Sequence, residues 1–160
     1  MLILQLHHGL LVLAMDSQFI GRAEPEVLKI LEQIFPNILI LSQWPIRKLI
    51  PNSWYNELNE ETKKHKFDFV VCGSKWLVIE VNYKHGEKAA KKWRQIFAPM
   101  IKELSNPCAI PVTINDYECL SLFKHTKTNH TKLRKSDYQD IINALQTAGV
   151  RVNFVIPECN

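Results

Sequence analysis

Two carboxylates near the middle of the chain have the spacing to form a metal-binding pair. Asp68 and Glu80 lie in the segment 66–85, where apolar and polar residues alternate as in a β-hairpin. If residue 68 opposes residue 80, the hairpin closes through a loop of common length, from Gly73 to Lys75. The two side chains then share one face, with their Cβ atoms about 5 Å apart. Paired hard oxygen ligands of this kind suit Mg²⁺.

The two faces of the hairpin differ in character. One face is apolar and is expected to lie in the core, with Phe67, Phe69, Val71, Leu77, Ile79, Val81 and Tyr83. The other face carries Asp68, Glu80, Asn82 and Lys84. A slip of one residue would place the two acids on opposite faces. On this pattern alone, an ordinary solvated face is as good an interpretation as a metal site.

A further acid belongs to a predicted helix near the start of the chain. Apolar residues recur at helical spacing from Gly21 until Pro36 ends the helix, and Pro25 suits the first helical position. Glu24 falls on the apolar stripe, whereas Glu26 lies on the solvent face. Glu24 is therefore either an N-cap, which is the commoner case, or a site residue directed at the sheet.

Composition is that of one globular domain. The chain has 160 residues, of which 46% are hydrophobic, and this is enough to bury a core. Its net charge of +4 permits an anionic partner without requiring one. The cysteines, at positions 72, 108, 119 and 159, show no C-x-x-C spacing, and the chain has no secretory signature. We expect reduced thiols and a cytoplasmic protein.

The N-terminal segment, residues 1–15, is the most apolar part of the chain. It is too short to span a membrane, and polar residues interrupt it. It is expected to form a packed strand pair or a helix, or to be an upstream extension of a protein that naturally starts at Met15. His7 and His8 would point apart on a strand, so ordinary histidines are a better interpretation than metal ligands.

Strands and helices alternate along the rest of the chain. We expect a buried strand at 38–41 that leads to Gln43, a polar excursion at 51–66, the hairpin, a helix at 86–104 that Pro99 kinks or breaks, an edge or end strand at 108–114, a basic loop at 124–135, a helix, and a last strand at 150–156. This order predicts an α/β fold.

The order of elements and acids resembles the PD-(D/E)XK nuclease superfamily, which has the restriction-endonuclease-like αβββαβ core with a central mixed sheet flanked by helices. The helix at 23–32 and the hairpin segments Phe67-Asp68-Phe69-Val70 and Ile79-Glu80-Val81 resemble archaeal Holliday junction resolvases. The segment 78–82 with His85 resembles very-short-patch repair endonucleases, which place a glutamine near the position of Gln43. The likeness covers about residues 20 to 115 of a single 1–160 domain.

The resemblance implies a role for each matching residue. Asp68 and Glu80 would bind the metal, Mg²⁺ with Mn²⁺ as a substitute, and Glu24 would complete or orient the metal shell. Gln43 would bond the attacking water or simply close a strand end. Asn82 stands where the family has its usual lysine, and Lys84 lies further along the same strand face, about 7 Å away. Pro25 is a second departure, because a residue before proline is steered away from helical geometry. Glu26 is the reserve candidate.

The function that the resemblance implies is Mg²⁺-dependent hydrolysis of phosphodiester bonds by a DNA endonuclease of repair, junction-resolving, restriction or homing type. Basic residues on the helix and in the loop are expected to contact DNA phosphates: Lys88, Lys92, Lys127, Lys132 and Arg134. The other interpretation of these residues is ordinary solvated charge. We expect no membrane partner, and a homodimer or higher homo-oligomer stays open. The alternative is a catalytically impaired nuclease-fold module that binds DNA or a protein partner.

Overall fold

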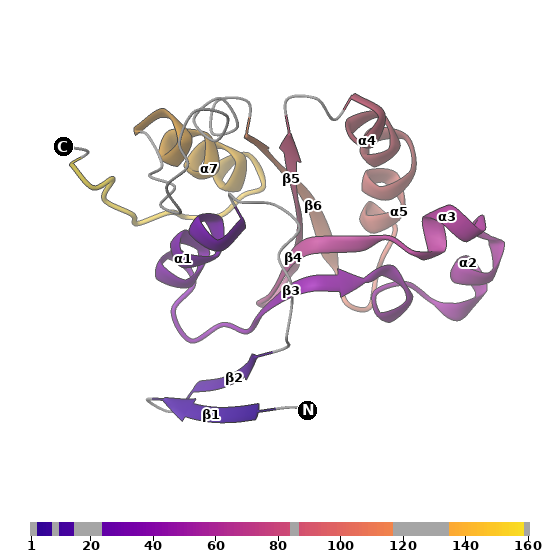
Figure 1. Cartoon of the computed structure of the whole chain (residues 1–160), viewed down its shortest axis with the longest axis horizontal. Coiled ribbons are helices and arrows are strands. Elements are labelled where there is room, and N and C mark those ends of the chain that lie inside the picture. The colour runs from indigo at the N-terminus through magenta and orange to yellow at the C-terminus, as the bar shows by residue number, and fades with distance from the viewer. Residues whose placement is uncertain (1–2, 8–9, 15–23, 84–86, 117–134, 159–160) are drawn as a thin grey trace, which may run out of the picture.

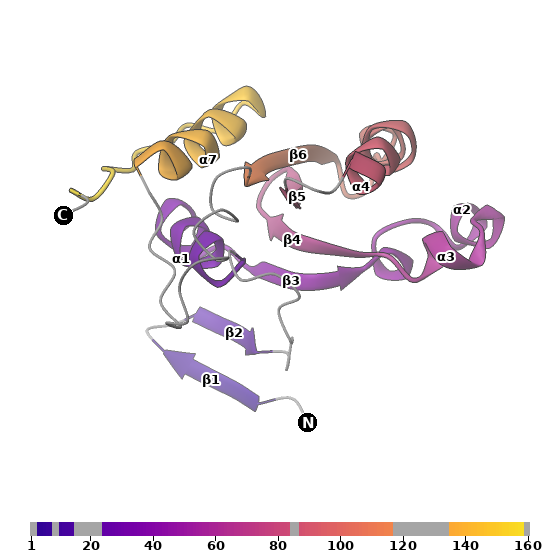
Figure 2. The same cartoon turned by 45° about the horizontal axis from the view of Figure 1, so that its top comes forward.

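The fold is a four-stranded mixed β-sheet with helices packed on both faces, as Figures 1 and 2 show. The computed structural model describes residues 3–7, 10–14, 24–83, 87–116 and 135–158. The sheet contains β3 (Ile40–Pro45), β4 (Lys66–Cys72), β5 (Trp76–Tyr83) and β6 (Ala109–Asp116), in that spatial order. Strands β1 (Ile3–His7) and β2 (Leu10–Ala14) form a separate antiparallel pair, which is one of the alternatives expected for this segment.

The hairpin has the register that the spacing of its acids predicts. Strand β4 pairs antiparallel with β5 through Phe69↔Ile79 and Cys72↔Trp76, and residues 73–75 connect them. Strand β3 runs antiparallel to β4, and β6 runs parallel to β5. Strand β6 lies at the edge of the sheet, which tolerates Pro111 because an edge strand does not need every N–H.

Each face of the sheet has its own hydrophobic core. The first core joins the sheet to helices α1 (Glu24–Ile34) and α7 (Lys135–Thr147), through residues such as Leu31 and Leu145. The second joins the opposite face to the segment formed by α4 (Glu87–Lys92), η2 (Trp93–Phe97) and α5 (Ala98–Lys102). Figure 1 shows α1 and α7 on one side of the strands and α4 and α5 on the other.

The helix expected at 86–104 is continuous from 87 to 102 but changes its winding before Pro99. Residues Trp93–Phe97 form a π-helical turn, and Pro99 stands at the start of α5. Proline lacks the N–H that an α-helix would use at this position, and a wider turn removes that demand. Trp93, Phe97 and Ile101 are buried as their spacing predicts, whereas Ala89, which was expected on the same stripe, is exposed.

The polar excursion between β3 and β4 is short and partly helical. It contains η1 (Ile46–Lys48), α2 (Asn52–Glu57) and α3 (Glu60–Lys63). Asn59 caps α3, since its side chain accepts a hydrogen bond of 2.8 Å from the backbone N–H of Thr62. Apolar residues of η1 and the turn after it, including Ile46 and Ile50, anchor the excursion in the second core.

Strict alternation along β4 fails at one place, and the prediction for Phe67 was wrong. Phe67 packs in the second core and Phe69 in the first, although residues two apart in a regular strand share a face. The neighbouring strand β3 contains the cause. Gln43, between the rungs Ser42↔Phe69 and Trp44↔Phe67, has φ +49°, which rotates the backbone out of the regular pleat.

The last strand, expected at 150–156, does not form. Residues 150–158 pair with no strand in the described part of the chain. Val150, Val152 and Phe154 of this tail pack on the first core instead, whereas Val155 is exposed. Phe154, for example, stacks on Tyr138 of α7 with ring centroids 5.9 Å apart. No described helix is long and apolar enough to cross a membrane.

The end of α7 depends on a glycine, which makes a testable prediction. Gly149 has φ +85°, and the N–H of Val150 bonds back to the carbonyl of Leu145, as in a helix C-cap. We expect Gly149→Ala to lower the free energy of unfolding by about 1 kcal/mol, because a Cβ disfavours positive φ. Chemical denaturation measures this change.

Gly73 in the hairpin loop is the matched control. A Cβ there would meet its nearest atoms at 3.5 and 3.7 Å, which are ordinary contacts, and its φ is not in the left-handed region. Gly73→Ala should change the free energy of unfolding by no more than about 0.5 kcal/mol. Equal losses in both variants would contradict the backbone explanation.

Candidate active site

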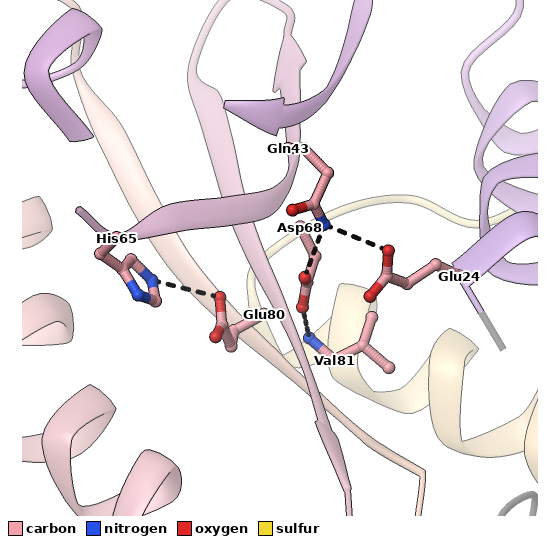
Figure 3. Close-up of polar contacts among 6 residues, drawn as sticks. All are labelled: Glu24, Gln43, His65, Asp68, Glu80 and Val81. Atoms are coloured by element: carbon pink, nitrogen blue, oxygen red, sulfur yellow. Dashed lines mark hydrogen bonds and ion pairs between the residues drawn. The ribbon is translucent and has the colours of Figure 1, made fainter. Parts of the chain in front are cut away.

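The site lies where strands β4 and β5 stop pairing. Their ladder ends at Phe69↔Ile79, and the same register places Asp68 opposite Glu80 at the next position. At this position a side chain, not a backbone carbonyl, bonds the neighbouring strand. Oδ2 of Asp68 accepts a hydrogen bond of 2.7 Å from the N–H of Val81 (Figure 3). The carboxylate is thus inserted between two strands, where its position is fixed by the sheet.

Gln43 joins this carboxylate to helix α1. Its Nε2 donates to Oδ1 of Asp68 at 3.2 Å and to Oε2 of Glu24 at 3.1 Å. The left-handed backbone of Gln43 costs about 1–2 kcal/mol, and the side chain is buried. Gln43 lies within β3, and its side chain bridges a buried acid, Glu24, and a partly buried acid, Asp68.

Glu24 is the first residue of α1 and is 1% exposed. The burial of Val27 and Leu31 on the same helix confirms that Glu24 belongs to the inward stripe. Pro25 does not turn the side chain away, because the proline occupies the first turn, where no N–H is required. The reserve candidate, Glu26, lies away from the site and pairs with Lys29 at 3.0 Å.

Glu80 lies on the side of Asp68 away from Glu24, and it faces His65, the residue just before β4. Nε2 of His65 and Oε2 of Glu80 are 3.6 Å apart. Both atoms are buried, and neither has a hydrogen-bond partner among the residues that the structure describes. The imidazole ring stacks on Phe97, with centroids 4.0 Å apart. Figure 3 shows Asp68 between Glu24 on one side and the Glu80–His65 pair on the other.

Burial and mutual repulsion make the acids weak. Burial first, and then the charge of Glu80, raise the pKa of Asp68 far above its usual value, and Gln43 and the Val81 N–H oppose the rise only in part. Burial raises the pKa of Glu80 as well, with a contribution from Glu24, while the backbone of Asp68 acts in the opposite direction. The site therefore favours protons or another cation over free carboxylates.

His65 is the residue that the sequence analysis missed. It lies in the run Lys63-Lys64-His65-Lys66, which is typical of the solvated end of an excursion. The available signal was its position two before Phe67, because a strand beginning at His65 would place both rings on one face. In the structure, His65 and Phe67 make an edge-to-face contact with centroids 4.9 Å apart.

The structure describes only some of the remaining predicted site residues. The backbone of Asn82 lies in β5, two residues after Glu80, and Lys84 lies outside the described residues. Lys88 is exposed on α4. Lys92 already contacts Glu61, at 3.5 Å, and the Phe97 ring. The loop residues Lys127, Lys132 and Arg134 are outside the described part of the chain.

The side chains of this site are of the types that bind a divalent cation, but they are not already arranged as a complete metal site. Carboxylate oxygens are the ligands that Mg²⁺ prefers, and Glu80 has a buried oxygen with no hydrogen-bond partner in the described part of the chain. Among the described residues, however, no group of three His, Cys, Asp or Glu side chains is already arranged to hold a metal. A cation would draw the Asp68 and Glu80 carboxylates together by replacing their repulsion with attraction.

Comparisons with protein-family models, curated proteins and solved structures find no match to this chain. Its function must therefore be argued from the geometry and chemistry of the site.

The raised pKa values predict how stability depends on pH without a divalent cation. Each acid binds its proton more tightly in the folded state than in the unfolded chain, where its pKa is near 4. The free energy of unfolding should therefore fall as pH rises from about 5 to about 8, by more than about 1 kcal/mol per acid. Thermal denaturation in a chelating buffer measures the trend.

Glu80→Gln should flatten this trend, since it removes one titrating group and the repulsion that raises the pKa of Asp68. Glu32→Gln is the control, because Glu32 is exposed on α1. If the free energy of unfolding depends on pH in the same way in wild type and Glu80→Gln, the pKa values of these acids are not raised in the folded state as we expect.

Proposed function

We propose that this protein is a divalent-metal-dependent DNA endonuclease with a restriction-endonuclease-like core. Asp68 and Glu80 hold Mg²⁺, and Glu24 and Gln43 orient the first of these ligands. The observation that carries the proposal is the arrangement of one buried acid on α1 and two partly buried acids on β4 and β5 around the rung where the hairpin opens.

An energetic argument supports this proposal. Burying carboxylates without a cation is costly, and apolar residues at these positions would make a more stable sheet. Such costs are typical of functional sites, where shifted pKa values serve binding or chemistry. A neutral amide, from Gln43, bridges Glu24 and Asp68, so the cluster keeps its negative charge when its protons leave.

Each residue then has a distinct task. Asp68 is held by the Val81 N–H and by Gln43, so its ligand geometry is set before a cation arrives. Glu80 supplies the second carboxylate from the neighbouring strand. Glu24 acts through Gln43, whose amide fixes the orientation of Asp68. Mg²⁺, when bound, would polarise the phosphate and lower the pKa of an attacking water.

DNA is the proposed substrate because a phosphodiester matches both the cation site and the charge of the chain. The net charge is +4, and Lys88 is exposed on the helix that follows β5. In this proposal Lys84 stabilises the charge that develops on the phosphorane, in place of the lysine that Asn82 replaces. Changing Lys84 to Met should remove cleavage while leaving most of the binding.

A second function follows from that same departure. An amide at position 82 cannot supply an ammonium group, so a nuclease fold with this sequence would bind DNA or a protein partner without cutting. The two functions differ in one result: only the nuclease cleaves plasmid DNA when Mg²⁺ is added to the purified protein.

We predict that Asp68→Asn and Glu80→Gln each reduce cleavage of plasmid DNA by at least about a hundredfold, because each removes a ligand of the cation. The melting temperature should stay the same or rise, since each change removes a buried acid. Gel assays of nicking in Mg²⁺, with thermal denaturation of the same samples, measure both.

Glu24 and Glu26 provide a matched pair on one helix. Glu24→Gln should reduce cleavage about tenfold or more, because it disturbs the amide that positions Asp68, whereas Glu26→Gln should cleave like wild type. Cleavage that survives both Asp68→Asn and Glu80→Gln would place the nuclease site elsewhere.

A further inference from the structure

We propose that His65 and Glu80 bind one divalent ion together, and that this pair makes the site prefer Mn²⁺ to Mg²⁺. The inference rests on the proposed function only in sharing Glu80 with it. It adds a nitrogen ligand, from the residue just before β4, to a site otherwise built from oxygen.

The inference is carried by two atoms that have no hydrogen-bond partner among the described residues. Nε2 of His65 and Oε2 of Glu80 are both buried and lie 3.6 Å apart. A direct hydrogen bond would bring them to about 2.7–3.2 Å. Two ligands about 2.1 Å from one ion lie roughly 3.0–3.4 Å apart, for angles of about 90–110° at the ion. The observed separation is too long for a hydrogen bond, and only a small movement of the Glu80 side chain would place an ion between the two atoms.

The imidazole is held in place by contacts that do not involve Glu80. Its ring stacks on Phe97 and meets the edge of Phe67, with centroids 4.0 and 4.9 Å away. The backbone of His65 donates to the carbonyl of Thr62 and accepts from the N–H of Ile46, both at 3.0 Å. The ring is thus directed at Glu80 before any ion binds, which lowers the entropic cost of coordination.

A positive charge lies near the imidazole, on Lys92. Its Nζ is 5.7 Å from the centroid of the Phe97 ring, on which His65 stacks. Lys92 also contacts Glu61, at 3.5 Å, and this acid partly balances the positive charge near the ring.

The nitrogen ligand determines which ion the pair selects. Mg²⁺ binds oxygen and keeps its water ligands, and it gains little from imidazole. Mn²⁺ also prefers carboxylate oxygen, but as a first-row transition metal it accepts an imidazole nitrogen more readily than Mg²⁺ does, although it binds such a site more weakly than the later metals of the series. His65 should therefore raise affinity for Mn²⁺ more than for Mg²⁺.

The experiment titrates Mn²⁺ alone, and Mg²⁺ alone, into the purified full chain. Electron paramagnetic resonance follows free Mn²⁺, calorimetry follows Mg²⁺, and pulsed resonance detects a coordinated imidazole nitrogen. Wild type should show the nitrogen coupling. His65→Phe, which keeps a ring against Phe97, should lose it and lower the ratio of Mn²⁺ to Mg²⁺ affinity by at least about tenfold.

A second variant and a control keep the result interpretable. His65→Gln replaces the nitrogen with an amide oxygen, so it should also lose the coupling and the preference while folding without the added apolar ring. Glu26→Gln, which alters an ion-paired acid away from the site, should keep both. An unchanged affinity ratio in both His65 variants, or no nitrogen coupling in wild type, overturns the inference.

These measurements, together with the plasmid cleavage assay, separate this inference from the proposed nuclease. If the protein cleaves DNA but His65 does not affect metal preference, the nuclease stands and the Mn²⁺ pair fails. If Mn²⁺ binds through His65 and no variant or condition gives cleavage, the pair stands and the nuclease fails.

Discussion

The hydrogen bonds of one amide group hold this site together. Nε2 of Gln43 contacts both Glu24 and Asp68, and it can do so because the backbone of Gln43 leaves the regular strand conformation. Where the backbone of Gln43 departs from the strand, the side chains of β4 stop alternating regularly. Phe67 then packs in the second core and Phe69 in the first, and Asp68 lies between the strands. The two cores, the opening of the hairpin and the position of the first acid are therefore connected through one residue.

The site is also a compromise between stability and charge. The sheet around it is well packed, with Phe67, Phe69 and Ile79 fully buried. Against this background, Asp68 and Glu80 are ionised only at a cost, because water is largely excluded and their charges repel. Protons relieve the cost when no metal is bound. A divalent cation would relieve it at neutral pH, and the proposed activity depends on this exchange.

Sequence reasoning succeeded where local patterns decide the structure. The hairpin register followed from alternation and loop length, and the inward direction of Glu24 followed from helical spacing. It failed where tertiary contacts decide. Nothing local shows that Gln43 takes a positive φ, so Phe67 was assigned to the wrong face. The tail at 150–156 has strand-like composition, yet its residues pack on the first core, as Phe154 does on Tyr138. His65 was missed because it lies in a basic run and because Phe97, on which it stacks, is distant in sequence.

The central claim is that the buried acids hold protons until a divalent cation replaces them. Calorimetric titration of Mg²⁺ near pH 7, in two buffers with different heats of ionisation, tests it most directly. If the claim is right, binding releases about one proton per ion, and the release disappears in Asp68→Asn and Glu80→Gln. Binding with the same heat in both buffers, or equal proton release from the two variants and wild type, would contradict it.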